Sequence, residues 1–107
     1  MIVTTTDTVP GMRVTRVLGL VRGSTIRARH LGHDIMAGFR NVAGGEVREY
    51  TKMLAETREQ ALDRMLEEAE RLGANACLGV RFQTSMVMRG ASEMLCYGTA
   101  VVLKAED

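Results

Sequence analysis

The order of apolar and polar positions predicts two strands near the N-terminus. Ile2–Thr5 consists of β-branched residues, and the Pro10-Gly11 pair that follows favours a type II turn. A second strand is predicted from Met12 to about Arg22, where apolar positions alternate. Both of its faces become apolar in the second half, which indicates a strand that is covered on two sides there.

The last third of the chain predicts an antiparallel hairpin. Ala76–Thr84 alternates between two faces, and the apolar run Met94–Leu103 follows a turn sequence at Arg89-Gly90. The two segments are therefore the third and fourth strands, paired with each other.

The same turn sets the predicted distance between the two cysteines of the chain. A turn centred on Arg89-Gly90 pairs Cys77 with Val102 and Cys96 with Gln83. The thiols are then far apart within one chain, so that neither a disulfide nor a chelating pair is expected.

Two helices are predicted between the second and third strands. The shorter one carries four apolar residues in one stripe at helical spacing, namely Leu31, Ile35, Phe39 and Val42. It ends at Ala43, because Gly44-Gly45 break the helix. The longer helix runs from about Glu46 to Leu72, with Gly73 as its C-cap. Its apolar arc consists of Val47, Leu54, Ala61, Met65 and Leu72, and its acidic residues lie opposite.

Composition and charge place the chain among single-domain α+β proteins. The 107 residues fit one domain, 1–107, with a small antiparallel-rich sheet of about four strands and one short and one long helix inserted between strands 2 and 3. A net charge of +1 argues against a nucleic-acid partner. No apolar stretch approaches the roughly 20 residues that span a bilayer, so no membrane partner is expected. Two cysteines without an export signal predict a reduced, cytoplasmic protein.

The predicted elements leave apolar surface uncovered. Two helices can cover one face of a four-stranded sheet, whereas the second and fourth predicted strands are apolar on both faces. A chain of this size cannot bury that surface alone. Self-association is therefore predicted, and a closed ring or a dimer is its usual form.

Several short motifs resemble one family. Gly44-Gly45, Gly73–Ala76 (GANA) and Gly98–Val101 (GTAV), at these spacings and with the opening run Met1–Thr6, are similar to the YbjQ-like family. The likeness covers nearly the whole chain. It implies an α+β fold assembled as a homopentamer, in agreement with the uncovered apolar surface. The family carries a heavy-metal-binding label, so the resemblance also suggests a transition or heavy metal ion as ligand, without a defined set of ligand residues.

The candidate metal donors are two cysteines and two histidines. Cys77 and Cys96 are the only thiols, and a metal site usually needs three or four donors, so symmetry would have to bring copies of one cysteine together. His30 and His33 lie three residues apart, and two imidazoles on one helical turn can chelate a divalent ion. The alternative is that the cysteines are small buried apolar side chains and that the histidines are exposed without a ligand.

Three further residues, Arg58, Gly44 and Gly45, are candidates for anion binding or for a subunit interface. The helical angle of Arg58 puts it inside the apolar arc of the long helix, where a buried guanidinium needs an acidic partner. Glu68 or a neighbouring subunit could supply that partner. Gly44-Gly45 precede the helix and could expose backbone N–H groups to an anion, or form a tight turn between the helices.

The leading functional hypothesis is a homo-oligomeric ligand-binding module with a metal ion as its ligand. The alternative is a ring-forming structural or interaction protein that binds no cofactor. An enzyme ranks third, since no Ser-His-Asp or Cys-His arrangement and no paired-carboxylate site is evident in the sequence.

Overall fold

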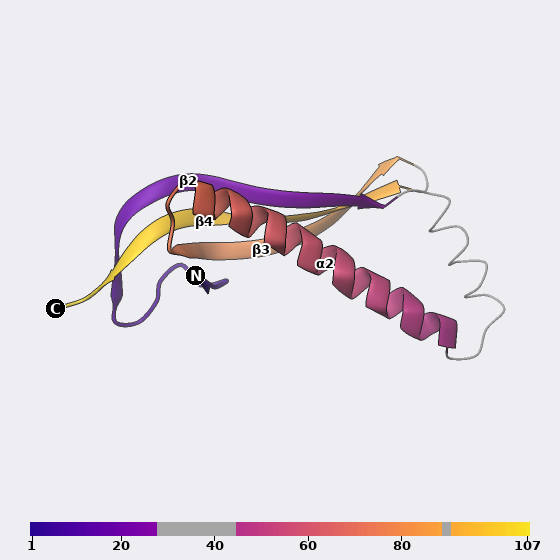
Figure 1. The fold of residues 1–107 in the computed structure, drawn as a ribbon, viewed down its shortest axis with the longest axis horizontal. Helices are drawn as coiled ribbons and strands as arrows, with labels where there is room; N and C mark the ends of the chain where they lie inside the picture. Colours follow the sequence, from indigo (N-terminus) through magenta and orange to yellow (C-terminus); the bar gives the residue numbers. More distant parts are fainter. Residues whose placement is uncertain (28–44, 89–90) are drawn as a thin grey trace.

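The computed structural model describes residues 1–27, 45–88 and 91–107, which form one sheet and one long helix (Figure 1). In chain order the elements are β1 (Ile2–Val3), β2 (Met12–Arg27), α2 (Gly45–Arg71), β3 (Ala76–Met88) and β4 (Ala91–Ala105). The helix lies across one face of the sheet and runs obliquely away from the strands toward its N-terminus. The predicted α+β class and the predicted long helix are confirmed.

The sheet has the strand order β1-β3-β4-β2. β3 and β4 pair antiparallel, as the predicted hairpin requires, and β4 also pairs antiparallel with β2. The antiparallel-rich sheet of four strands is thus confirmed, although β2, β3 and β4 all extend further than their patterns predicted. β2 forms one edge of the sheet.

β1 forms the other edge and pairs in parallel with β3, a contact that no local pattern predicts. Val3 is in register with Cys77. Backbone hydrogen bonds continue the pairing beyond the strand, as far as the Thr6 carbonyl, which accepts from the Gly79 N–H at 2.9 Å. The strand is therefore shorter than the predicted Ile2–Thr5, because the chain bends at residues 5–7 while these backbone hydrogen bonds continue.

The predicted turn at Pro10-Gly11 is confirmed. Gly11 has a φ of +78°, as the third position of a type II turn requires, and the Met12 N–H donates to the Val9 carbonyl at 3.0 Å. The turn directs the chain into β2.

A bulge in β3 changes which residues share a face of the sheet. Gly79 has a φ of +61°, and Gly79 and Val80 together lie opposite Gly98 of β4. The extra residue moves Val80 onto the face that carries Cys77. The regular alternation predicted for Ala76–Thr84 is therefore wrong beyond this glycine.

The register of the hairpin differs from the prediction for the same reason. Cys77 pairs with Ala100 and Cys96 pairs with Phe82, so the predicted partners are wrong by two positions and by one position respectively. The register shifts twice along β3, once between Met86 and Met88 and once at the Gly79 bulge. A turn position alone predicts no such shifts.

The boundaries of α2 agree with the prediction. The helix begins one residue before the predicted Glu46 and ends at Arg71. Gly73 follows with a φ of +86°, and the Ala74 N–H donates to the Ala69 carbonyl at 3.1 Å. The predicted glycine C-cap is confirmed.

The helix packs through one row of buried residues spaced four apart: Thr57, Ala61, Met65 and Ala69. Leu54, a member of the predicted apolar arc, is instead 38% exposed, and Arg58 is exposed. Arg58 is therefore not buried within its own chain, and its pairing with an acidic group of a neighbouring subunit stays a prediction. The helix crosses the sheet obliquely, so its more N-terminal turns have no strand beneath them (Figure 1).

A hydrophobic core lies on each face of the sheet. The core under the helix consists of Val21, Ala61, Met65, Ala69, Cys77, Val80, Cys96 and Ala100. The smaller core on the opposite face consists of Ala76, Leu78, Val101 and Leu103, against which Val9 and Met12 pack. The segment between β1 and β2 thus covers only part of the second face.

Some predicted features lie outside the described residues. These are the shorter helix from Leu31 to Ala43, the histidines His30 and His33, Gly44 and the Arg89-Gly90 turn.

The helix backbone approaches the sheet closely at Gly23 of β2, which predicts a large effect of substitution there. A Cβ at this position would collide with the Ala61 carbonyl oxygen and the Met65 nitrogen, both backbone atoms of α2. Backbone atoms cannot turn aside as a flexible side chain can. We expect Gly23→Ala to lower the free energy of unfolding by about 2 kcal/mol or more, since overpacking of a tight core costs at least about 1–3 kcal/mol. Urea denaturation measures this change.

The control for Gly23→Ala is Ser24→Ala, on the adjacent residue of the same strand. Ser24 pairs with Leu95 and its side chain is directed to the other face of the sheet. Equal stability of Gly23→Ala and the unsubstituted protein would contradict the observed helix–strand contact.

Candidate functional site

The first candidate site is the contact between Cys77 and the N-terminal residue. The parallel pairing of β1 with β3 sets Val3 opposite Cys77, and the Thr4 N–H donates to the Cys77 carbonyl at 3.1 Å. This arrangement holds Met1 beside the thiol, which donates to the Met1 Sδ at 3.8 Å. Cys77 is fully buried, whereas Met1 is 49% exposed. The thioether therefore separates the thiol from solvent.

The second cysteine forms a similar pair beneath the helix. The Cys96 thiol donates to the Met65 Sδ at 3.6 Å. Both residues are fully buried in the core between α2 and the sheet. This pair has no exposed member.

The two sulfur pairs are separate sites. Cys77 pairs with Ala100, which lies four residues from Cys96 along β4, a distance of about 13 Å at the usual rise of a strand. Disulfides require Cα atoms within about 7 Å. The expectation that the thiols neither form a disulfide nor chelate one ion is consistent with this register, although their partners differ from those predicted.

Burial raises the pKa of both thiols. The pKa of Cys77 lies above its ordinary value because the side chain is removed from water. Burial and the nearby charge of Cys77 raise the pKa of Cys96 to about 11. Both side chains are therefore neutral thiols at pH 7, whereas the thiolate is the form that binds metal. A metal ion must displace the proton.

The chemistry of these donors fits a soft metal ion. Within residues 1–27, 45–88 and 91–107, no three His, Cys, Asp or Glu side chains lie together as a metal-binding group, whereas a structural zinc site uses four such ligands. The core offers two pairs of one thiol and one thioether instead. Thiolate and thioether sulfur are the donors that select Cu(I).

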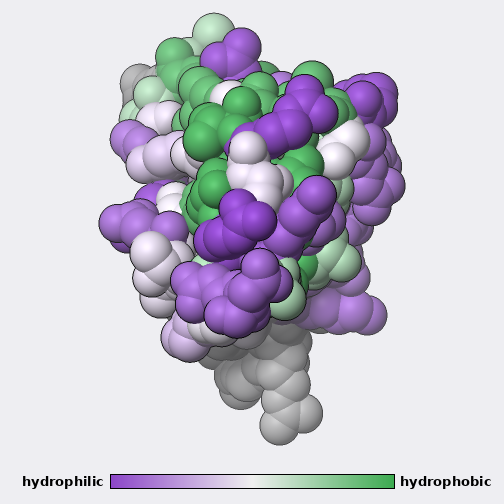
Figure 2. All heavy atoms as spheres, turned by 90° about the vertical axis from the view of Figure 1, so that its left-hand side faces the viewer, coloured by the Kyte–Doolittle hydropathy of each residue, from purple (hydrophilic) through white to green (hydrophobic). Residues whose placement is uncertain are grey.

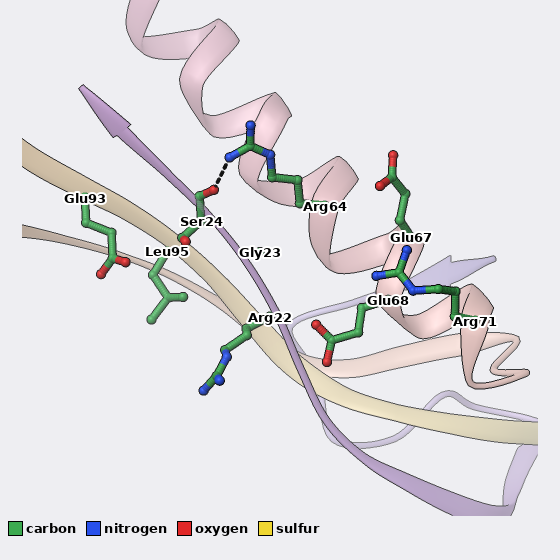
Figure 3. A pocket seen from close by; sticks show the side chains of 9 residues that line it. All are labelled: Arg22, Gly23, Ser24, Arg64, Glu67, Glu68, Arg71, Glu93 and Leu95. Atoms are coloured by element: carbon green, nitrogen blue, oxygen red, sulfur yellow. Dashed lines mark hydrogen bonds between the residues drawn. The ribbon is translucent and has the colours of Figure 1, made fainter. Parts of the chain in front are cut away.

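A groove of about 540 Å³ runs along the free edge of β2 (Figure 3). It is lined by Arg22, Gly23, Ser24, Arg64, Glu67, Glu68, Arg71, Glu93 and Leu95. The Arg64 guanidinium reaches from α2 to the edge of the sheet and donates to the Ser24 carbonyl. Three arginines face three glutamates in this groove, so it has no net charge that would favour an anion.

The predicted anion or interface residues do not line this groove. Arg58 is exposed six residues before Arg64 on α2, and Gly45 is the first residue of the helix. The structure therefore does not bring Arg58 or Gly45 to the groove. Gly44 lies outside the described residues.

The outer face of β2 forms an exposed apolar surface, which we call the β2 surface: Val14, Val17 and Leu20. Val17 is 68% exposed and Leu20 is 62% exposed. These residues pair with Leu103, Val101 and Thr99 of β4, on the face opposite the helix. Seen from the end that carries both termini, hydrophobic residues gather in the upper and central part of the molecule, bordered by hydrophilic residues (Figure 2).

The hairpin carries a second apolar surface, which we call the hairpin surface: Phe82 and Met86, with Val87 and Met88 near the tip. All four are about half exposed or more, and Met86 reaches 77%. Phe82 pairs with Cys96 and Met86 with Ser92, so both lie on the face that α2 covers elsewhere. Of these positions the predicted strand Ala76–Thr84 included only Phe82, and its pattern did not show that the helix leaves this residue uncovered.

Comparisons with known proteins agree on one family. The family model YbjQ_1, described as "Putative heavy-metal-binding", matches residues 1–104. A UPF0145 protein of Methanosarcina acetivorans is 61% identical over 101 residues, which cover 94% of this chain and 95% of the relative. A UPF0145 protein of Thermus thermophilus is 60% identical over 104 residues, which cover 97% of this chain and 91% of the relative.

A solved structure supports the fold. A protein of unknown function of the DUF74 family from Pediococcus pentosaceus is similar with a TM-score of 0.63, over 97% of this chain and 98% of that chain. The two sequences are 16% identical, so the likeness concerns the fold alone. In the described part of the chain, no helix is both long enough and apolar enough to cross a membrane.

The raised pKa of Cys96 predicts a loss of stability at alkaline pH. The thiol ionises near pH 9.0 in the unfolded chain and near pH 11 in the fold, so the folded state retains the proton more strongly between these values. The stability that the neutral thiol contributes is complete below pH 9 and is lost as the pH rises through 11. We expect this loss to be roughly 2 kcal/mol in urea denaturation between pH 8.5 and 11.

Cys96→Ala removes the titrating group and serves as the comparison. Its stability should fall less steeply over the same pH range, because it lacks the one thiol by which the two proteins differ. Parallel pH profiles for the two proteins would contradict the raised pKa.

Proposed function

Because this chain belongs to the YbjQ_1 family, we propose that it acts in the cytoplasm as a homo-oligomeric module, assembled through its exposed apolar surfaces, with a heavy or transition metal ion as its ligand. The observation that carries the proposal is the β2 surface. Val14, Val17 and Leu20 stand side by side on an edge strand and remain largely exposed. Neighbouring large aliphatic side chains on one face are typical of a surface that another protein covers.

The energetics favour covering this surface. Full burial of one Val or Leu side chain contributes about 1.5–3 kcal/mol. The segment between β1 and β2 covers the adjacent core of Leu78 and Leu103 but leaves Val17 and Leu20 in contact with water. A second copy of the chain can supply the missing cover.

Two different surfaces support a ring rather than a two-fold dimer. The β2 surface lies on the face opposite the helix, whereas Phe82 and Met86 of the hairpin surface lie on the face of the helix. If the β2 surface of one copy meets the hairpin surface of the next, the interface is heterologous, and heterologous interfaces that close form rings. Five copies are the number that the family resemblance implies.

Arg58 belongs to the interface in this proposal. Its exposed side chain lies one helical turn after Leu54, which is itself 38% exposed. An acidic group of a neighbouring copy can pair with it. The Gly44-Gly45 segment at the start of α2 is proposed as a part of the same region.

The metal ion is supported by the family description and by the donor chemistry. We assign Cys77 and Cys96 as sulfur donors, with His30 and His33 as the nitrogen donors that the sequence offers. The alternative function is a ring that binds no cofactor and acts as a structural or interaction protein. This alternative is supported by the same apolar surfaces and differs from the metal-binding module only in that the ring holds no metal.

The assembly predicts a mass several times that of one chain. One chain has a mass of 11.7 kDa. We expect native mass spectrometry of the untagged protein to give a multiple of this mass, and Val17→Glu with Leu20→Glu to reduce it to a monomer, because a buried charge opposes association. Lys52→Glu, on the exposed outer side of α2, is the control and should keep the multiple. A monomer for the unsubstituted protein would overturn the proposal.

The heterologous interface predicts rescue between complementary variants. A chain with Val17→Glu and Leu20→Glu keeps its hairpin surface, and a chain with Phe82→Glu and Met86→Glu keeps its β2 surface. Each should be monomeric alone, whereas an equimolar mixture should form a 1:1 dimer through the one intact interface. A mixture that remains monomeric would contradict contact between these two surfaces.

The metal ligand predicts stoichiometric metal in the untagged protein. Elemental analysis should find metal in the protein as purified or after exposure to metal salts, and replacement of both cysteines and both histidines by Ala should remove it. Unchanged metal content, or none after exposure to Zn²⁺, Cu²⁺ and Ni²⁺ and to Cu(I) under reducing conditions, would favour the ring without a cofactor.

A further inference from the structure

We propose that the Cys77–Met1 pair is a binding site for one soft monovalent cation, Cu(I) or its analogue Ag(I), with the N-terminal methionine as the outer ligand. The inference rests on the metal ligand of the proposed function and adds the class of the ion and the residues that hold it. It follows from the distance, charge and access of the two sulfur pairs.

The distance between the sulfur atoms suits two ligands of one ion. The Cys77 Sγ and the Met1 Sδ lie 3.8 Å apart. Two sulfur atoms that each bind an ion at about 2.3 Å are separated by at most about 4.6 Å. The pair can therefore hold an ion with small movements of the exposed Met1 side chain.

The charge of the site selects a monovalent ion. Binding replaces the proton of the thiol: Cys77–SH and M⁺ give Cys77–S–M and H⁺, which is released to water, without a change of oxidation state. The thiolate neutralises a monovalent ion, and the thioether is neutral, so the bound site carries no net charge. A divalent ion would leave one positive charge beside a fully buried residue, which costs several kcal/mol.

The second thiol cannot supply the second negative charge that would neutralise a divalent ion. Cys96 lies about 13 Å along the sheet from the partner of Cys77 and is held against Met65. Within the described part of the chain, no further group of three His, Cys, Asp or Glu side chains surrounds the site. The soft, neutral two-sulfur site therefore favours Cu(I) over Zn²⁺.

Access distinguishes the two pairs. Met1 is 49% exposed, and the two-residue edge strand β1 that follows it is held to β3 by a few backbone hydrogen bonds. Local opening of a segment with few contacts costs little free energy. Cys96 and Met65 are fully buried under α2, so an ion reaches them only when the helix moves from the sheet. The ion should bind at Cys77.

The test is titration of the full-length, untagged protein with Ag(I), which is redox-inert, followed by native mass spectrometry and competition with a chromophoric chelator. Intact mass first establishes that Met1 is present. We expect one Ag(I) per chain. Cys77→Ala, and a chain released from a cleavable fusion so that it begins at Ile2, should each lose at least about tenfold in affinity, equivalent to 1.4 kcal/mol. Met53→Leu, which removes a thioether outside both sulfur pairs, is the matched control, and its affinity should stay within about twofold of the unsubstituted protein.

The results separate this site from the other proposals. Loss of Ag(I) in Cys96→Ala alone, equal affinity in Cys77→Ala, or tighter binding of Zn²⁺ than of Ag(I) would overturn the Cys77–Met1 site. The same mass spectra report the number of chains. A monomer that binds Ag(I) through Cys77 would remove the ring and keep the site, whereas a ring that takes metal only through His30 and His33 would keep the proposed function and remove the site.

Discussion

The architecture depends on one backbone contact, the approach of α2 to β2 at Gly23. Because this residue has no side chain, the helix backbone at Ala61 and Met65 can rest directly on the edge strand. Arg64, on the same turn of the helix, reaches the edge of the sheet, where its guanidinium donates a hydrogen bond to the Ser24 carbonyl. The helix is thereby fixed over β2 and the neighbouring part of β4. It cannot also cover the hairpin, since it crosses the strands obliquely (Figure 1).

Two consequences follow from this position of the helix. Small residues, Ala61 and Ala69, suffice to fill the space beneath it, so the core holds its sulfur atoms at short distances, such as the 3.6 Å between Cys96 and Met65. Larger apolar residues elsewhere remain uncovered, among them Leu20 and Met86. The close sulfur contacts in the core and the exposed apolar side chains therefore have one cause. In the part of the chain that the structure describes, one helix crosses the sheet obliquely and covers only part of its strands.

The sequence predicted the features that local patterns determine. The long helix, its C-cap at Gly73, the turn at Pro10-Gly11 and the antiparallel hairpin each depend on residues close together in the chain. The bulge at Gly79 was missed, because a glycine inside a strand pattern fits both a regular strand and a bulge. The exposure of Arg58 was missed because the buried row of α2 has a spacing of four residues and drifts around the helix, so that at this level Thr57, and not Arg58, faces β2. The pairing of Met1 with Cys77 is a contact between distant residues, and no spacing predicts it.

The contact between Met1 and Cys77 shows why a count of cysteines alone does not predict the proposed metal site. Counting thiols gives two donors, too few for zinc, and the register separates them. The fold changes the count by adding a thioether to each thiol and by leaving only Met1 exposed. A thiol with a raised pKa resists losing its proton to water, yet a monovalent ion that takes the place of that proton leaves the site neutral. The same burial that suppresses the thiolate therefore favours one class of ion, and the two-residue strand β1 controls its entry.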